Sequence, residues 1–167
     1  MSARQGGVPG DLPEAAETLH DSDAIDILIA DDEPNIRRLL ELVLRPTGLR
    51  IETVANGAEI VERFRLYHGE VRLVLLDVQM PVLDGPETFR RLKEIDPEAK
   101  VLFMSGDPNP YVAASLLALG AIGYFEKPFL DVTALVTRVR QIAAAGHAHA
   151  KSHRWEPQVT DAHASRE

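Results

Sequence analysis

The chain has 167 residues, the length of one ordinary domain, and a formal net charge of −8 from 18 basic and 26 acidic residues. This charge argues against broad nucleic-acid binding, which needs a basic footprint, and the absence of cysteine excludes disulfides, thiolate metal sites and a cysteine nucleophile. No apolar run reaches the roughly 20 residues that cross a bilayer, and the N-terminus lacks the apolar core of a signal peptide. We therefore expect a cytoplasmic protein without direct contact to nucleic acid or membrane.

The ends of the chain differ in composition from its middle. Residues 1–24 carry one basic and five acidic side chains, residues 146–167 are neutral overall, and both segments are poor in large apolar residues. Such segments bury too little surface to offset the entropy lost on ordering. We therefore expect a flexible acidic N-terminal tail over 1–24, one folded domain over 25–145 and a flexible C-terminal tail over 146–167.

Within the domain, short apolar runs alternate with amphipathic segments. Residues 25–30 predict a buried strand, and Ile36, Leu40 and Leu44 then recur at the spacing of one helix face. Further along the chain the pattern predicts strands over 49–54, 71–76, 100–104 and 121–125, and helices over 57–67, 86–95, 110–119 and 130–145. Strands that alternate with helices in this way indicate an α/β fold with a parallel sheet covered on both faces.

Polar residues stand where the predicted strands end. Asp31 and Asp32 follow the first strand, Asp77 the third, Ser105 the fourth and Lys127 the fifth. In a parallel sheet with right-handed crossovers, the carboxyl ends of the strands lie along one edge, where ligands bind. We therefore expect these five side chains to share one site.

The chemistry of this set points to phosphoryl transfer. Three carboxylates in one site repel one another, and a divalent cation that prefers oxygen ligands, such as Mg²⁺, compensates for the repulsion. A carboxylate left partly free can attack phosphorus and form an aspartyl phosphate. The charge on the phosphoryl oxygens then needs neutralising, which the cation, the Lys127 ammonium and the Ser105 hydroxyl can do together. The sequence therefore predicts a phosphoaspartate site.

Four sequence motifs carry a resemblance to a known family: IADDEPN, LVLLDVQMPVLDGPE, VLFMSGD and ALGAIGYFEKPF. On these motifs, over about residues 25–145, the chain resembles the CheY-like receiver domain of bacterial two-component response regulators. The resemblance implies a doubly wound sheet of order 2-1-3-4-5, as in flavodoxin, with helices on both faces. It also implies a signalling phosphoprotein that catalyses only its own phosphorylation and dephosphorylation. Because residues 146–167 are too few for an effector domain, we expect a stand-alone receiver, with a fragment of a longer protein as the alternative.

The resemblance implies a role for each matching residue at the site. Asp77 matches the phosphoacceptor of the family. Asp31, Asp32, Asp77 and the backbone carbonyl of Gln79 match the ligands of Mg²⁺. Lys127 matches the lysine that pairs with the phosphoryl group.

Further positions match residues that respond to phosphorylation. Ser105 matches the switch hydroxyl, and Tyr124 matches the aromatic side chain that changes rotamer on activation. Gln79 and Asp107 occupy positions that tune hydrolysis of the phosphoaspartate in the family. We therefore expect appreciable self-dephosphorylation.

The resemblance also implies partners. The phosphoryl donor would be a phosphohistidine on a histidine kinase or a phosphotransfer protein, and a downstream protein would bind the surface of the fourth helix, fifth strand and fifth helix. Residues 108–125 contain no charged side chain. We expect an apolar patch on the fourth helix that binds a partner or a second copy of the chain, because large exposed patches usually mark interfaces.

Other functions fit parts of the pattern. A phosphate sink in a relay would use the same fold and the same site residues. A phosphorylation-independent docking module would also use this fold, but its sign would be loss of the acidic pair or the lysine, and both are present. A phosphatase of the haloacid-dehalogenase type needs a second Asp two residues after the first, where this chain has Gln79. A nucleotide-binding fold would need a glycine-rich loop after the first strand, and that loop is absent.

Overall fold

The computed structural model describes residues 25–107 and 110–145, so both predicted tails lie outside the described residues. The strands are Ile27–Ala30 (β1), Ile51–Val54 (β2), Leu73–Asp77 (β3), Val101–Ser105 (β4) and Gly123–Glu126 (β5). The helices are Pro34–Leu44 (α1), Gly57–Leu66 (α2), Gly85–Ile95 (α3), Pro110–Ala118 (α4) and Val132–Ala145 (α5), with a short 3₁₀ helix at Arg45–Thr47 (η1). None of the helices described is both long enough and apolar enough to span a membrane.

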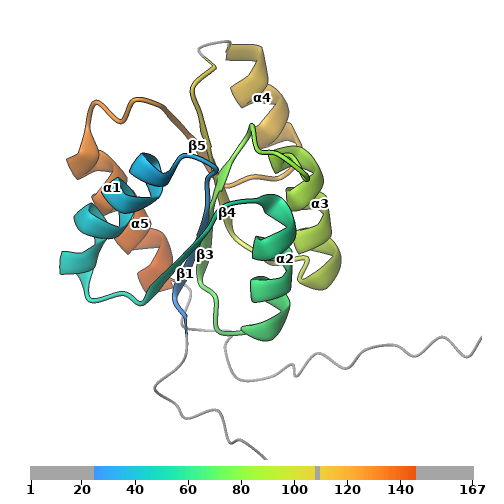
Figure 1. The fold of residues 1–167 in the computed structure, drawn as a ribbon, viewed down its shortest axis with the longest axis horizontal. Coiled ribbons are helices and arrows are strands. Elements are labelled where there is room, and N and C mark those ends of the chain that lie inside the picture. Colours follow the sequence, from blue (N-terminus) through green and yellow to red (C-terminus); the bar gives the residue numbers. More distant parts are fainter. Residues whose placement is uncertain (1–24, 108–109, 146–167) are drawn as a thin grey trace, which may run out of the picture.

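The sheet has the predicted topology. All strand pairs are parallel, and the strand order is β2-β1-β3-β4-β5. α1 and α5 cover one face of the sheet, and α2, α3 and α4 cover the other (Figure 1). The structure therefore confirms the doubly wound α/β fold.

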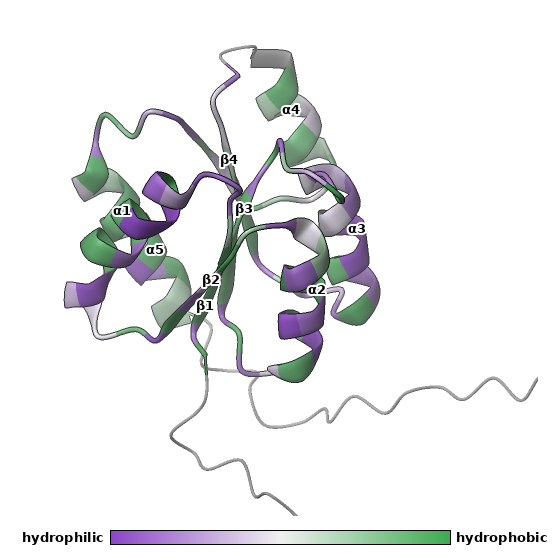
Figure 2. Cartoon of the chain, in the orientation of Figure 1, coloured by the Kyte–Doolittle hydropathy of each residue, from purple (hydrophilic) through white to green (hydrophobic). Residues whose placement is uncertain are grey.

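The sheet separates two apolar clusters. Successive side chains of a strand point to opposite faces, so Leu28 and Ala30 join the cluster under α2, α3 and α4, whereas Ile27 and Ile29 join the cluster under α1 and α5. Figure 2 shows the hydrophobic colour along the central strands and hydrophilic segments on the outward sides of the helices. Strands buried on both faces explain why the sequence shows continuous apolar runs rather than alternation.

Two strands extend one residue further than their apolar runs predict. Asp77 is the last residue of β3, opposite Met104, and Ser105 is the last residue of β4, opposite Glu126. Both polar side chains therefore start from backbone that the sheet holds in register. β5 begins two residues later than predicted, at Gly123, where a Cβ would lie 2.5 Å from Cδ2 of Leu102.

A charged cluster joins three strands at the opposite end of the sheet. Asp26 precedes β1 and is 6% exposed, and its carboxylate accepts the backbone N–H of Arg50 at 2.8 Å. The same carboxylate lies 3.1 Å from Nε of Arg72. Because Arg50 precedes β2 and Arg72 precedes β3, one buried side chain ties together the starts of β1, β2 and β3.

We expect Asp26→Asn to lower the free energy of unfolding by about 2 kcal/mol, because it weakens two charge-assisted contacts of a buried group. Urea unfolding followed by circular dichroism measures this loss. Glu94→Gln removes the same charge from an exposed position of α3 and should change stability by less than about 0.5 kcal/mol. An Asp26→Asn variant as stable as the Glu94→Gln control would show that the cluster does not stabilise the fold.

Candidate functional site

Three carboxylates gather at the carboxyl ends of β1 and β3. Asp31 follows β1 and is fully buried, Asp77 ends β3 and is 4% exposed, and Asp32 is exposed. One carboxylate oxygen from each residue lies within 4.8 Å of the other two. The structure therefore brings together the acidic residues that the sequence placed at these strand ends.

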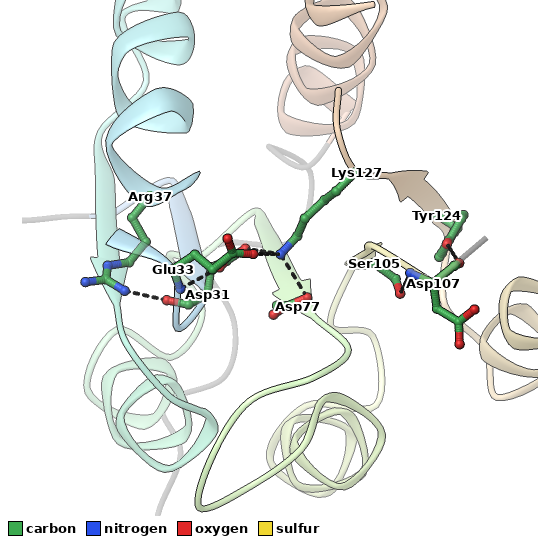
Figure 3. Close-up of polar contacts among 8 residues, drawn as sticks. All are labelled: Asp31, Glu33, Arg37, Asp77, Ser105, Asp107, Tyr124 and Lys127. Carbon is green, nitrogen blue, oxygen red and sulfur yellow. Dashed lines mark hydrogen bonds and ion pairs between the residues drawn. The ribbon is translucent and has the colours of Figure 1, made fainter. Parts of the chain in front are cut away.

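Lys127, directly after β5, reaches into the acidic cluster (Figure 3). Its Nζ lies 2.8 Å from Oδ2 of Asp31 and 3.1 Å from Oδ1 of Asp77, and the lysine side chain is only 8% exposed. A third carboxylate, that of Glu33, lies 3.4 Å from the same nitrogen. The ammonium group thus stands between two buried anions and one exposed anion.

The loop before α1 is organised by Asp31 rather than by a helix cap. Oδ1 of Asp31 accepts the backbone N–H of Glu33 at 2.9 Å, and the backbone carbonyl of Asp31 accepts Nη1 of Arg37 at 2.6 Å. Glu33 is the N-cap residue of α1, but its side chain makes no capping hydrogen bond. In the sequence, the acidic run is typical of the start of a helix. In the structure, the Glu33 carboxylate instead lies near Lys127, a contact that the sequence did not predict.

Burial sets the electrostatics of the cluster. Burial is the main cause that raises the pKa of Asp77 to about 6, and the negative charge of Asp31 adds to it while Lys127 opposes it. Burial also raises the pKa of Asp31, and the interaction with Lys127 offsets only part of this effect. Burial alone would lower the pKa of Lys127, but Asp31 and Asp77 outweigh it, so the pKa of the ammonium lies above its usual value. The carboxylates therefore attract further positive charge.

The donor set fits a small divalent cation. Asp31 Oδ2 is buried and accepts no hydrogen bond from any described residue, although it forms the ion pair with Lys127. The three carboxylates offer only oxygen atoms, which are the ligands that Mg²⁺ prefers. Asp32 and Gln79 are exposed at this edge, so water can complete the coordination of an ion. The acidic cluster thus offers the oxygen ligands of a Mg²⁺ site.

The remaining predicted residues form a second group beside the cluster. Ser105 is 1% exposed, its Oγ accepts the backbone N–H of Asp107 at 3.0 Å, and its backbone carbonyl accepts the N–H of Lys127 at 2.7 Å. The hydroxyl of half-buried Tyr124 donates to the backbone carbonyl of Asp107 at 3.0 Å (Figure 3). Asp107 therefore links the serine to the tyrosine.

A glycine without a predicted role holds the end of β3 against α3. A Cβ at Gly85 would lie 2.5 Å from the backbone oxygen of Asp77 and 2.8 Å from Cα of Val78. The N–H of Gly85 donates to the carbonyl of Val78 at 3.0 Å, and Asp84 caps α3 by accepting the N–H of Glu87 at 2.9 Å. The first turn of α3 thus packs directly on the backbone that positions Asp77.

We expect Gly85→Ala to lower the free energy of unfolding by about 2–3 kcal/mol, because the added methyl group overlaps backbone atoms rather than flexible side chains. Gly106→Ala is the matched control, since a Cβ there meets nothing within 4 Å. Chemical denaturation of both variants compares them directly. Equal stability of the two variants would contradict the close packing of α3 on β3.

Comparison with known proteins identifies the family. Residues 27–140 match the family described as the response regulator receiver domain. The chain therefore belongs to the response regulator receiver family and to two-component signalling, and its acidic pocket is consistent with an aspartyl-phosphate site. Members of this family are not classical enzymes, and they interact with kinases and with downstream partners.

Several relatives show how this domain is used elsewhere. The chain is 33% identical to the sensor kinase CckA of Brucella abortus over 70% of this chain and 12% of the kinase. It is 40% identical to the response regulator receiver protein CpdR of the same organism over 48% of this chain and 65% of that protein. It thus spans less than two thirds of either curated relative.

A solved structure of similar fold contains a metal ion. The response regulator TrrA of Thermotoga maritima, in complex with Mg²⁺ and beryllium fluoride, superimposes with a TM-score of 0.62 at 30% identity, over 71% of this chain and 98% of TrrA. Homologous structures therefore contain Mg²⁺.

Proposed function

We propose that this protein accepts a phosphoryl group on Asp77 from a phosphohistidine of a histidine kinase or phosphotransfer protein. In this proposal Mg²⁺ is held by Asp31, Asp32, Asp77 and the backbone carbonyl of Gln79. The observation that carries the proposal is the Lys127 ammonium, which lies 3.1 Å from Asp77 inside a cluster of three carboxylates. A cytoplasmic location and a folded unit over 25–145 are part of the same proposal.

The transfer forms one bond and breaks another. An oxygen of the Asp77 carboxylate attacks phosphorus while the P–N bond of the donor breaks, and the electron pair stays on the imidazole nitrogen, which takes a proton from solvent. A pKa of about 6 leaves Asp77 mostly ionised at pH 7.5, as a nucleophile must be. Mg²⁺ supplies positive charge to the phosphoryl oxygens. Lys127 and the hydroxyl of Ser105 bind the remaining oxygens.

The Ser105–Asp107–Tyr124 contacts support a switch in response to this reaction. A phosphoryl group adds charge and acceptor oxygens, which attract the Ser105 hydroxyl. Rotation of that hydroxyl releases the N–H of Asp107, whose carbonyl holds Tyr124 at 3.0 Å. Tyr124 then turns inward, which reshapes the surface of α4, β5 and α5 as a population shift between two packings. Gln79 and Asp107 orient the water that later hydrolyses the phosphoaspartate.

The reshaped surface includes two exposed leucines. Leu117 and Leu119 of the α4 region are 47% and 45% exposed, whereas Leu116 is buried. They support binding of a downstream protein or of a second copy through α4, with no direct contact to nucleic acid or membrane. Sedimentation with and without beryllium fluoride tests the second copy, and a monomer in both states at high concentration would exclude it.

Intact mass measurement tests the proposed reaction. The full chain, incubated with Mg²⁺ and acetyl phosphate, should gain one phosphoryl group, and Asp77→Asn or chelation of the metal should prevent the gain. Asp96→Asn, beyond the last turn of α3, is the matched control and should be phosphorylated like the wild type. No gain with acetyl phosphate or with a phosphorylated kinase would instead identify a docking module that works without phosphorylation.

A further inference from the structure

A groove of about 810 Å³ lies between α1 and the edge strand β2. We call it the α1 groove. Its wall combines guanidinium groups with aliphatic side chains, and the residues that matter here are Arg37, Arg38, Arg45, Leu42, Leu49 and Ile51. The proposed phosphoryl transfer uses none of them.

Two of the groove arginines have side chains without a partner among the described residues. Arg37 donates to the carbonyl of Asp31, and Glu41, the acidic residue of the groove, accepts the hydroxyl of Thr53 at 2.6 Å. Arg38 and Arg45 are exposed, and their guanidinium groups make no ion pair or hydrogen bond with any residue that the structure describes. Beside them, the Leu42 side chain is 67% exposed. The groove therefore combines free positive charge with exposed apolar surface.

The N-terminal part of the same chain has the complementary character. Residues 11–23 contain no lysine or arginine and five acidic side chains: Asp11, Glu14, Glu17, Asp21 and Asp23. Leu12 and Leu19 are separated by about two helical turns. Pro13 and Glu14 directly follow Leu12 and suit the first turn of a helix with Asp11 as its N-cap. We propose that residues 11–23 occupy the α1 groove, with their acidic side chains on Arg38 and Arg45 and their leucines against Leu42.

The position at which the chain enters the domain supports this occupant. The N–H groups of Asp26 and Ile27 both donate to the carbonyl of Arg50, at 2.9 and 3.0 Å. Arg50 stands between Leu49 and Ile51, which line the groove. Residues 11–23 are therefore joined to the domain beside one end of the groove. A helix over 11–20 would be about 15 Å long, close to the length of about 16 Å of α1.

Because residues 11–23 are joined to the domain by a short connection, weak contacts are sufficient to hold them in the groove. Individual ion pairs between exposed side chains are weak, but a short tether gives an effective concentration on the order of millimolar. The far end of the groove is lined by Pro34 and Asn35, which directly follow the loop of Asp31 and Glu33. The binding itself does not depend on phosphorylation of Asp77.

A spin label on the full chain tests the proposal. The protein has no cysteine, so Thr18→Cys gives a unique labelling site within residues 11–23. In low salt, the label should broaden the backbone amide signals of Asn35 and Leu42 in α1 strongly, and leave that of Lys93 in α3 sharp. In about 1 M salt, where the Debye length falls to about 3 Å, the α1 signals should recover their intensity.

Charge reversal separates docking from mere proximity. Arg38→Glu/Arg45→Glu should restore the Asn35 and Leu42 signals in low salt. The control Arg65→Glu/Arg91→Glu makes the same charge change on α2 and α3 and should leave the broadening unchanged. Absence of broadening, or broadening that persists in Arg38→Glu/Arg45→Glu, would overturn the proposal. Slower phosphorylation of Arg38→Glu/Arg45→Glu by a kinase, without any broadening in the wild-type groove, would assign the groove to a partner protein instead.

Discussion

In the absence of Mg²⁺, Asp77→Asn should be more stable than the wild-type protein at pH 7.5, by up to about 3 kcal/mol. The physical reason is that the folded protein raises the pKa of Asp77 from 3.8 to about 6, mainly by burial and then by the nearby charge of Asp31. A shift of this size corresponds to about 3 kcal/mol, because one pKa unit is worth about 1.4 kcal/mol. Asparagine has nearly the same shape and does not ionise, so the penalty disappears.

The pH dependence of this difference has a defined sign. Below about pH 4, Asp77 is protonated in the folded and unfolded states, and the pKa shift favours the folded state fully. Between about pH 4 and pH 6, the folded state keeps a proton that the unfolded state has lost, so wild-type stability falls as pH rises. Above about pH 6 both states are ionised and the full penalty applies. The advantage of Asp77→Asn should therefore be small at pH 4 and reach its maximum near neutral pH.

Urea unfolding from pH 4 to pH 8 measures this difference in a chelating buffer. Glu62→Gln, exposed on α2, removes the same charge at a position that is not buried. Its stability should stay within about 0.5 kcal/mol of the wild type. Adding Mg²⁺ at pH 7.5 should stabilise the wild type more than Asp77→Asn, because the variant has lost one anionic ligand. A variant no more stable than the wild type at pH 7.5 would contradict the raised pKa.

Lys127→Met should have the opposite effect and lower the free energy of unfolding by about 3 kcal/mol at pH 7.5 without Mg²⁺. Among the described residues, Lys127 is the cation that pairs with the carboxylates of Asp31 and Asp77. Methionine retains much of the aliphatic stem but leaves these buried carboxylates without a counter-charge. The loss should be smaller at pH 5, where Asp77 can take up a proton. Phosphorylation by acetyl phosphate should also slow sharply.

A double-mutant cycle tests whether the stability lost in Lys127→Met comes from its pairing with Asp77. If the cost of Lys127→Met arises from Asp77, then the same substitution in the Asp77→Asn background should cost clearly less. Lys100→Met is the matched control, since Lys100 makes no ion pair within the described part of the chain. Additive effects of Asp77→Asn and Lys127→Met would show that the two charges are not coupled.

The fold could be predicted from the sequence because the strands are short and the central strands β1, β3 and β4 are buried on both faces. Such strands read as continuous apolar runs, and helices with one apolar face separate them, so element type and order were clear. The ends of β3 and β4 were less clear, because Asp77 and Ser105 are polar and yet belong to the sheet. The late start of β5 depends on the approach of Gly123 to Leu102, which no local pattern encodes.

The candidate site was predictable where it depends on strand ends alone. The convergence of Asp31, Asp32 and Asp77 follows from parallel strands that end at one edge. Contacts between elements far apart in the sequence were not predictable, because they depend on side-chain reach across the fold. Glu33 near Lys127, 94 residues away, is one such contact, and Gly85 against Asp77 is another.

The two apolar clusters on either side of the sheet affect how the sequence of such a protein can evolve. Tyr124 packs against one cluster together with α4, whereas its neighbour Phe125 packs against the other together with α1 and α5. Substitutions that alter the α1 groove therefore change the packing on one side of the sheet, and substitutions around Leu116 change the packing on the other. Asp77, at the end of β3 between β1 and β4, stands at an edge of the sheet that both sides share. The packing on each side of the sheet can thus diversify separately around an unchanged chemical centre.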